Sequence, residues 1–238
     1  MRVSGVDAVS YLERMLSNDV PAEGSVDALL LTPKARVIAP LLVWRRGADD
    51  VLLLTEPGLG EVVRTHLMRM RFAARCEVEL EDHTSTIVFD PEAVGIPNRD
   101  YGRPAVELLD ADLVPSLSDD ELDRLRIEGG TPRFGCEIDD RVLPAEAGLD
   151  TRAISFSKGC YPGQEPVARQ HYRGKVNRLL RVLEVDGDPP AAETPVTHDG
   201  KEVGRVTSAV PGLALAYVRV SVPDDAALDV AGRPARLR

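Results

Sequence analysis

Cysteine is scarce in this 238-residue chain, which contains only three of these residues, far apart in the sequence. Cys76, Cys136 and Cys160 form neither a CxxC pair nor a Cys/His spacing of the kind that holds zinc. We therefore expect three reduced thiols and no stably bound metal. The motifs GxxxxGKS/T and GxGxxG, which bind phosphates and dinucleotides, are also missing, so no nucleotide cofactor is expected.

Long apolar runs are missing as well. The most apolar segments, 28–31 and 38–44, have the length of a strand and fall well short of the roughly 18 residues that a membrane helix needs. Residues 1–7 contain no cationic segment followed by an apolar one, so no secretory signal is predicted. The expected location is the cytoplasm, with no membrane partner.

Positive charge is in deficit, because 29 Lys and Arg face 39 Asp and Glu, for a formal net charge of −10. Such a chain repels nucleic acid and anionic lipid at long range, so a site for a polyanion must be a local patch. The candidate patch lies between Glu165 and Glu184, where no acidic residue occurs. It could hold an anionic ligand tail or a phosphate backbone, or it could be the solvent face of a strand. Its basic residues are Arg169, His171, Arg173, Lys175, Arg178 and Arg181.

Periodicity in the first third of the chain predicts an α+β domain at residues 1–82. A helix is expected after Asp7, its proposed N-cap, and a second, amphipathic helix is expected from Gly58. Strand-like segments lie at 27–31, 36–44, 51–55 and 76–80, and the first three are ordered like an antiparallel meander.

Two further domains are predicted, at 83–175 and 176–238. In the first, Ser118 and Glu121 form a capping box for a helix that ends at Gly129, before an irregular stretch at 131–165. So long a stretch is typical of a functional loop or a linker. In the last domain, short strands alternate with turn clusters, which indicates a small β-barrel or sandwich.

The most informative segment is KGCYPGQE at residues 158–165. Its two glycines permit close backbone approach or positive φ, and Pro162 stiffens the loop between them. Positive charge near a thiol favours the thiolate, and Lys158 lies two residues from Cys160. Cys160 is therefore a candidate nucleophile or a metal or cluster ligand. The alternative is a small buried side chain in a tight loop.

These residues resemble the KGCYxGQE signature of the YgfZ family, folate-binding proteins that are related to the glycine cleavage T-protein and include a mitochondrial iron–sulfur assembly factor. The resemblance covers nearly the whole chain and implies two ferredoxin-like α+β domains plus a C-terminal β-barrel around a central folate pocket. It extends to the flanks at 154–156, 167–169 and 173–174, to 125–132 and 144–149, and at lower specificity to 17–20.

The resemblance also implies roles for individual residues. Glu128 occupies the position at which T-protein relatives hold the pterin, whose N3 hydrogen and 2-amino group one carboxylate can accept; the alternative is a solvated glutamate at a helix end. The expected ligand is tetrahydrofolate or a derivative, and Cys160 with Lys158 forms the expected catalytic pair. The other expected folate contacts are Arg126, Tyr161, Gln164, Glu165, Arg169 and Arg173.

One departure from the T-protein pattern concerns catalysis. T-protein enzymes carry an aspartate pair where this chain has Ala39 and Pro40, and neither residue can act as a general base. Glycine cleavage activity is therefore not expected. In the preceding turn, Lys34-Ala35-Arg36 replaces the more usual glycine-arginine.

The leading hypothesis is a folate-binding accessory protein for iron–sulfur cluster assembly or repair and, through such enzymes, tRNA modification. Cys160 would act as nucleophile, redox residue or cluster ligand. Reduced folate, iron–sulfur assembly proteins or client enzymes, and a weak tRNA contact through residues 169–181 are the expected partners. Two alternatives stay open: a folate-dependent methyl or aminomethyl transferase, and a non-catalytic scaffold that docks a partner through the Cys160 loop.

Overall fold

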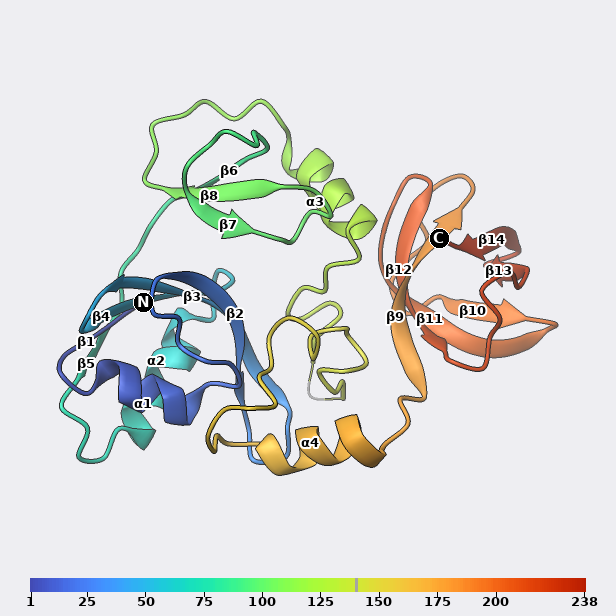
Figure 1. Ribbon diagram of the computed structural model, residues 1–238. Helices are drawn as coiled ribbons and strands as arrows, with labels where there is room; N and C mark the ends of the chain where they lie inside the picture. The colour runs from blue at the N-terminus through green and yellow to red at the C-terminus, as the bar shows by residue number, and fades with distance from the viewer. Residues whose placement is uncertain (140) are drawn as a thin grey trace. The chain divides into compact units, whose positions relative to one another are not determined.

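The computed structural model describes residues 1–139 and 141–238 and shows an α+β fold with a closed β-barrel in its C-terminal part (Figure 1). The chain divides into two units. The N-terminal unit comprises Met1–Thr84, Asp139–Ala145 and Leu149–Gly174, and the C-terminal unit comprises Ser85–Ile138, Glu146–Gly148 and Lys175–Arg238. The structure thus groups the segment that contains KGCYPGQE with the N-terminal unit. The three-domain division at 82/83 and 175/176 stays a prediction.

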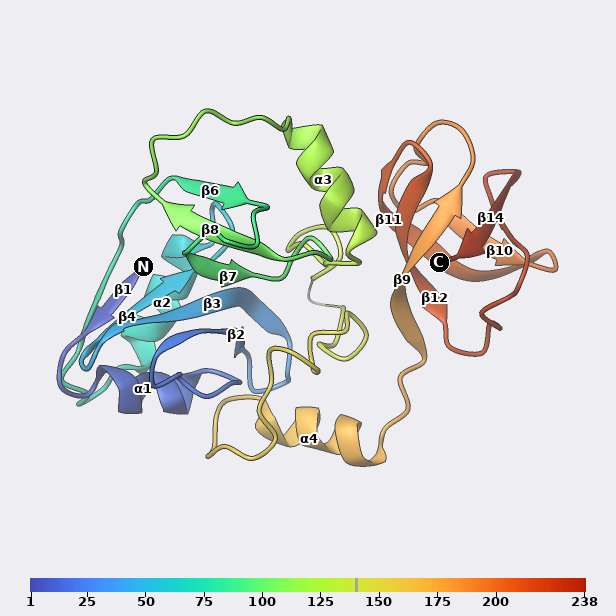
Figure 2. The ribbon, with the colours of Figure 1, turned by 45° about the horizontal axis from the view of Figure 1, so that its top comes forward.

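The N-terminal unit contains a five-stranded antiparallel sheet in the order β2-β3-β4-β1-β5 (Figure 2). Both helices of this sheet domain pack on one face of it, because Leu12 and Leu67 share a single buried cluster with Ala39, Leu41 and Val43. The strands are β1 (Arg2–Ser4), β2 (Gly24–Leu31), β3 (Val37–Gly47), β4 (Asp50–Leu54) and β5 (Glu77–Glu79), and the helices are α1 (Ala8–Met15) and α2 (Gly60–Met70).

Asp7 lies at the predicted N-cap of α1, but its side chain makes no capping hydrogen bond. Its carboxylate instead accepts hydrogen bonds from the backbone N–H of Arg75 at 2.9 Å and from the Arg75 guanidinium at 3.1 Å. The expected local cap is therefore replaced by a contact over 68 residues of sequence, because a charged donor outcompetes the helix N–H groups for this carboxylate.

The C-terminal unit begins with a three-stranded antiparallel sheet in the order β6-β8-β7. These strands are β6 (Ser85–Val88), β7 (Ile96–Asn98) and β8 (Ala105–Leu109), and they are followed by α3 (Asp119–Glu128). The predicted capping box of α3 is confirmed, since Ser118 and Glu121 bond to each other's backbone N–H groups. Ile127 of α3 packs against Leu213 and Leu215 of the barrel.

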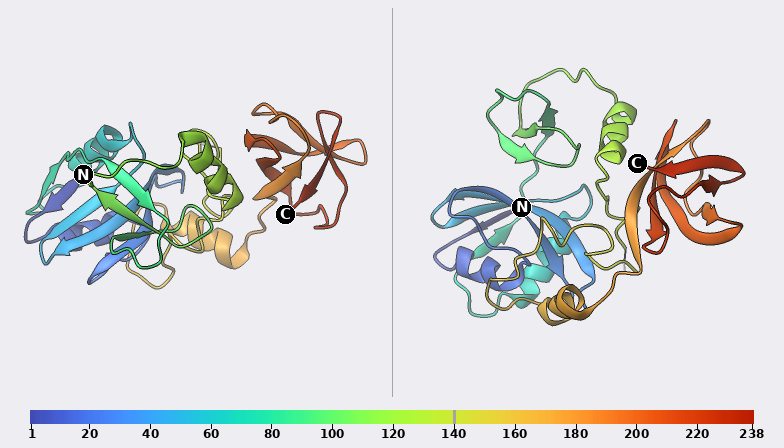
Figure 3. Two further views of the ribbon diagram at one scale, coloured as in Figure 1. Left: turned by 90° about the horizontal axis from the view of Figure 1, so that it is seen from above. Right: turned by 45° about the vertical axis from the view of Figure 1, so that its right-hand side comes forward.

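The barrel closes in the antiparallel order β10-β11-β12-β9-β14-β13 (orange and red in Figures 1 and 3). Closure leaves no strand edge open to pairing with another chain. A side chain at Gly204 would meet the carbonyl oxygen of Tyr217 at 2.2 Å, so only glycine permits this strand contact. The strands are β9 (Arg178–Val185), β10 (Pro195–His198), β11 (Lys201–Val210), β12 (Leu213–Arg219), β13 (Leu228–Val230) and β14 (Arg233–Leu237).

The buried carboxylate of Glu137 joins the loop after α3 to the barrel. One oxygen accepts hydrogen bonds from Arg126 Nη1 at 3.1 Å and from the backbone N–H of Arg133 at 3.0 Å. The other oxygen accepts from Ser208 Oγ at 2.5 Å, and the Glu137 carbonyl accepts from the Tyr217 hydroxyl at 2.9 Å. Every oxygen of this buried residue is thus satisfied, which is the condition for a buried charge to be tolerated.

We expect Glu137→Gln to lower the free energy of unfolding by about 3 kcal/mol, because it leaves the buried Arg126 guanidinium without one carboxylate partner. Urea unfolding followed by circular dichroism measures this loss. The control is Glu184→Gln, which removes an exposed ion pair with Arg236 and should cost under about 1 kcal/mol. Equal stability of the two variants would contradict a structural role for the Glu137 network.

Candidate functional site

Ser17 anchors the chain segment that leads into KGCYPGQE. The side chain of this fully buried residue donates to the carbonyl of Ala153 at 2.6 Å and accepts from the backbone N–H of Leu29 at 2.7 Å. The Ser17 carbonyl also accepts from the N–H of Ser155 at 2.9 Å. One serine after α1 therefore ties strand β2 to residues 153–155.

Asn18 continues this attachment. Its amide nitrogen donates to the carbonyl of Asp27 at 2.8 Å and to that of Arg152 at 3.3 Å, and its amide oxygen accepts from the N–H of Asp19. The structure thus explains why residues 17–20 share in the family resemblance. They hold the approach to the cysteine loop rather than contribute chemistry of their own.

Lys158 provides the first fixed point of the loop at residues 158–163. Its side chain is only 1% exposed, and its ammonium group lies 3.0 Å from Glu13 Oε2 and donates to the carbonyl of Asn18. The other oxygen of Glu13 accepts from the N–H of Val20 at 2.7 Å. These contacts support a positioning role for Lys158, and its catalytic role stays a prediction.

Tyr161 and Gly163 provide the second fixed point. Tyr161 is 7% exposed, and its burial raises the pKa of its hydroxyl to about 12. Gly163 has φ +85°, and a side chain there would meet the carbonyl oxygen of Thr32 at 2.6 Å and the backbone of Ala35 at 3.2 Å. The loop therefore packs against the turn before β3, and both the backbone angle and the space require glycine at this position.

Cys160 lies between these two fixed points and is exposed to solvent. The alternative of a small buried side chain is therefore wrong for Cys160, although it holds for Cys76. The side chains of Lys158 and Tyr161, before and after it, are buried, so the loop is held on both sides of the exposed thiol. Such an arrangement suits a cysteine that meets a partner or a ligand.

The helix α4 (Gln164–Arg173) follows directly after the loop (Figure 1). The alternative of a strand face is therefore wrong for Arg169, His171 and Arg173, whereas Arg178 and Arg181 do lie in strand β9. Pro166 lies in the first turn, where a missing N–H costs nothing, and Glu165 near the start and Arg173 near the end both suit the helix dipole. Gln164 makes only long contacts, to the carbonyls of Lys158 at 3.5 Å and Gly159 at 3.4 Å.

Aromatic and basic side chains share the surface of α4. His171 stacks on Phe156 with ring centroids 3.9 Å apart, and Tyr172, which is 68% exposed, meets both rings edge-on. Arg169 and Arg173 are exposed and form no ion pair with any residue that the structure describes. In this unit the basic stretch thus leaves two arginines available to an anion.

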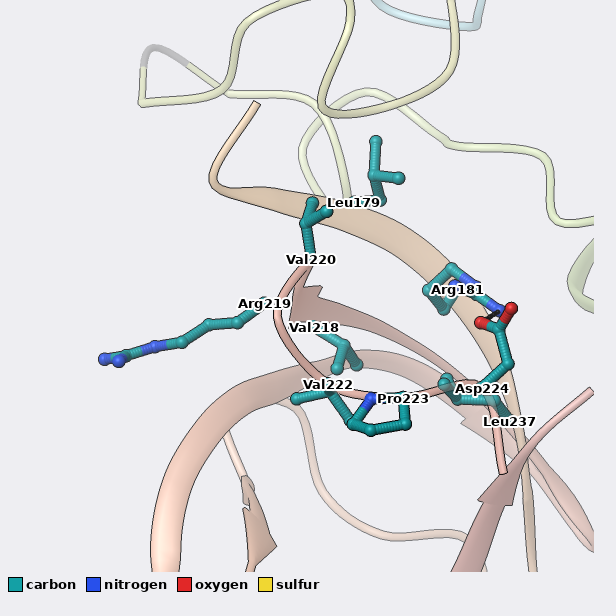
Figure 4. Close-up of a pocket in the computed structure, with 9 residues that line it drawn as sticks. All are labelled: Leu179, Arg181, Val218, Arg219, Val220, Val222, Pro223, Asp224 and Leu237. Atoms are coloured by element: carbon teal, nitrogen blue, oxygen red, sulfur yellow. Dashed lines mark hydrogen bonds and ion pairs between the residues drawn. The ribbon is translucent and has the colours of Figure 1, made fainter. Parts of the chain in front are cut away.

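The later part of the basic stretch belongs to the C-terminal unit and is largely neutralised. Arg178 pairs with Glu146 at 3.0 Å, and Arg181 pairs with Asp224 at 2.9 Å. Arg181 also lines a cavity of about 330 Å³ on the barrel, whose wall is otherwise mostly aliphatic (Figure 4). None of the residues expected to contact folate lines this cavity.

Glu128 and Arg126 lie at the end of α3 in the C-terminal unit. Glu128 Oε1 lies 3.2 Å from Arg124 Nε, and the Glu128 side chain is 27% exposed, so a ligand can reach it. Arg126 is buried and donates to Asp123 at 2.7 Å, to the carbonyl of Thr131 at 2.7 Å and to Glu137. The contacts of Arg126 are thus internal, and its predicted role toward folate would be to fix this helix end.

Arg36 is the residue that the sequence did not single out as a site. Its Nη1 is buried without a hydrogen-bond partner, and the same is true of the Tyr161 hydroxyl. A buried donor without a partner is costly, so each fits a ligand that brings acceptors, as the carbonyl and carboxylate groups of a folate do. The residues of this unit therefore fit a folate.

Comparison with known proteins agrees with this arrangement. Residues 177–238 match the family described as CAF17, C-terminal beta-barrel domain. The mitochondrial iron-sulfur cluster assembly factor IBA57 homolog of Pyricularia oryzae is 25% identical, over 98% of this chain and 72% of that protein. The tRNA-modifying protein YgfZ of Hamiltonella defensa is 24% identical, over 88% of this chain and 76% of that protein.

Among solved structures, glycine cleavage system aminomethyltransferase T from Bartonella henselae matches with a TM-score of 0.80 at 18% identity. The match covers all of this chain and 81% of that one, and it concerns the fold. These comparisons support the predicted resemblance to the YgfZ and aminomethyltransferase-related family. The predicted fold class is confirmed.

The chain departs from the T-protein pattern at β3. Ala39 is fully buried on the helix-covered face of the sheet, and the carbonyl of Pro40 accepts a hydrogen bond from Thr55 Oγ1 at 2.8 Å. Neither side chain can take a proton from a substrate. The expected lack of glycine cleavage activity stays a prediction with this physical reason.

No helix within residues 1–139 and 141–238 has the length and apolar character needed to cross a membrane. No group of three or more His, Cys, Asp or Glu side chains in that part of the chain could hold a metal ion.

We expect Lys158→Met to lower the free energy of unfolding by about 1–3 kcal/mol, because Glu13 and the Asn18 carbonyl lose their shared partner. The backbone N–H groups of residues 158–163 should also exchange faster with deuterated solvent. Urea unfolding and hydrogen exchange measure the two effects, and Lys34→Met, at an exposed lysine, is the matched control. Exchange at the wild-type rate in Lys158→Met would show that the ion pair does not position the loop.

Proposed function

We propose that this protein supports the assembly or repair of iron–sulfur clusters through the thiol of Cys160, and that it binds a reduced folate. The observation that carries the proposal is the exposed Cys160 between the buried side chains of Lys158 and Tyr161. Thiolates are the preferred protein ligands of iron–sulfur clusters, and an exposed one can reach a cluster that a partner carries. The cluster is cargo in this proposal, so no metal stays on the chain.

The names of the relatives also support a role in iron–sulfur cluster assembly. One relative is an iron-sulfur cluster assembly factor and another a tRNA-modifying protein. Both descriptions are consistent with one activity, if the tRNA-modifying enzymes that this protein serves contain clusters. The proposal includes client enzymes or assembly proteins as partners, and the cytoplasm as the location.

The folate part of the proposal assigns the pterin to Glu128. A carboxylate accepts the N3 hydrogen and the 2-amino group of a pterin together, and both bonds are charge-assisted. Arg124 Nε lies 3.2 Å from Glu128 Oε1, and the Glu128 side chain is partly exposed. The signature residues Tyr161, Gln164 and Glu165, together with Arg169 and Arg173 on α4, are the further proposed contacts.

A weak tRNA contact stays a prediction, now narrower than the stretch 169–181. Arg178 and Arg181 are paired with carboxylates, which leaves the α4 arginines beside the exposed ring of Tyr172. Aromatic rings next to unpaired cations suit unpaired bases of RNA. Since the chain as a whole is acidic, such a contact should weaken steeply with salt.

Cys160→Ser tests the thiol. In a host that lacks its own copy of this protein, we expect the variant to restore cluster-containing enzymes no better than an empty vector, because a serine hydroxyl is a poor ligand for iron. Cys136→Ser, at the other exposed cysteine, should restore them like wild type. If Cys160→Ser also rescued fully, the thiol would be dispensable and the non-catalytic scaffold would be the better reading.

Glu128→Ala tests the folate assignment. The variant should bind tetrahydrofolate roughly 10–100-fold more weakly, which corresponds to the loss of about 1.5–3 kcal/mol from hydrogen bonds to a charged group. Calorimetric titration measures the dissociation constant, and Glu202→Ala, at an exposed glutamate on the barrel, is the control. An unchanged dissociation constant for Glu128→Ala would remove Glu128 from the binding site.

A further inference from the structure

Two hydrogen-bond donors of the N-terminal unit are buried and have no hydrogen-bond partner among the described residues. They are Nη1 of Arg36 and the hydroxyl of Tyr161. The buried donors of Ser17 and Lys158 in the same unit do have partners. Folded proteins rarely leave such donors unpaired unless a ligand or water completes them. The Arg36 guanidinium is the stronger indication of a ligand, because it carries a charge and forms no ion pair with a described residue.

These two residues come from segments that pack against each other. Tyr161 precedes Gly163, whose backbone touches Thr32 and Ala35, and Arg36 follows Ala35. The turn is closed by hydrogen bonds between the N–H of Thr32 and the carbonyl of Arg36 at 2.9 Å, and between the N–H of Arg36 and Thr32 Oγ1 at 3.1 Å. Both backbones are therefore held before any ligand arrives, which limits the entropy lost on binding.

The strand pattern separates Arg36 from the core. Val37, Ala39 and Leu41 are buried, whereas Arg36 and Pro40 occupy the alternate positions and are partly exposed. Arg36 itself lies just before the first residue of β3, in the turn that Thr32 closes. The Arg36 side chain is therefore not part of the hydrophobic core.

The chemistry of the pair selects an acidic ligand. A guanidinium matches a carboxylate in shape and charge, and a phenol adds one more donor. Tyr161 keeps its proton at neutral pH, because burial raises its pKa to about 12, so it donates rather than repels an anion. No other charged group competes, since Arg36 forms no ion pair with a described residue.

We propose that Arg36 and Tyr161 together bind a carboxylate group of a ligand, beside the Cys160 loop. This inference rests on the proposed function in one respect, in that the carboxylate is taken to be that of the glutamate tail of the folate. In this proposal the glutamate tail does not bind the exposed arginines of α4, whose hydrogen bonds water already satisfies. It binds Arg36 and Tyr161, whose donors have no partner in the free protein.

The first test uses the free protein. Arg36→Met and Tyr161→Phe each remove a donor that bonds to nothing, so the urea midpoint should stay the same or rise, unlike that of Lys158→Met. A lower midpoint for either variant would mean that the donor has an internal partner, and it would overturn the inference without any ligand being present.

The second test separates the two ends of the ligand by calorimetric titration. The probes are tetrahydrofolate, 6-methyltetrahydropterin, which has only the head, and p-aminobenzoylglutamate, which has only the tail. Arg36→Met and Tyr161→Phe should each weaken tetrahydrofolate and the tail probe roughly tenfold, and leave the head probe unchanged. Arg69→Met, at an exposed arginine of α2, is the matched control. The double variant should lose less than the sum, because both donors hold one group.

The outcomes distinguish this inference from the proposed function. If 6-methyltetrahydropterin binds, and neither Arg36→Met nor Tyr161→Phe changes the dissociation constant of any probe, the carboxylate site is wrong while folate binding stands. If only the tail probe binds, and Arg36→Met abolishes its binding, the subsite stands and the folate assignment fails. If the variants weaken head and tail equally, or if wild type binds none of the three probes, the inference is overturned.

Discussion

The ion pair between Lys158 and Glu13 is the contact on which the candidate site depends. A lysine ammonium that is almost fully buried requires a carboxylate and a carbonyl around it, and Glu13 and Asn18 supply them. Because Glu13 belongs to α1 and Asn18 to the turn after it, the first helix of the chain determines where a loop some 140 residues later is held. Cys160 can be exposed and still well positioned for this reason.

In the C-terminal unit, burial separates the roles of two neighbouring residues. Arg126 and Glu128 are two residues apart on α3, but one is buried in a network with Glu137 and the other is partly exposed. Burial commits the arginine to internal partners, since an unpaired buried charge would destabilise the fold. The exposed glutamate keeps one oxygen that an external ligand can reach. Neighbouring residues of one motif thus have separable roles.

Much of the fold followed from local patterns. The capping box at Ser118, the apolar stripe of α2 and the closely spaced strands of the barrel are all short-range signals, and each is present in the structure. The basic stretch shows a limit of such patterns, because basic residues at alternate positions fit a strand face as well as a helix surface. Arg169, His171 and Arg173 lie on α4, whereas Arg178 and Arg181 lie on β9. Asp7 shows a similar limit, because its partner Arg75 is distant in the sequence.

The sequence by itself determined the family resemblance, the α+β and barrel architecture, and Cys160 as the residue of interest, because these depend on motif letters and on periods of two and 3.6 residues. Only the tertiary structure decided that Cys160 is exposed, that Lys158 and Arg126 are held by internal carboxylates, and that Arg36 and Tyr161 keep unpaired donors. Burial and hydrogen bonds depend on contacts between segments far apart in the chain. A local sequence pattern therefore does not show which distant group, if any, will be the hydrogen-bond partner of a side chain.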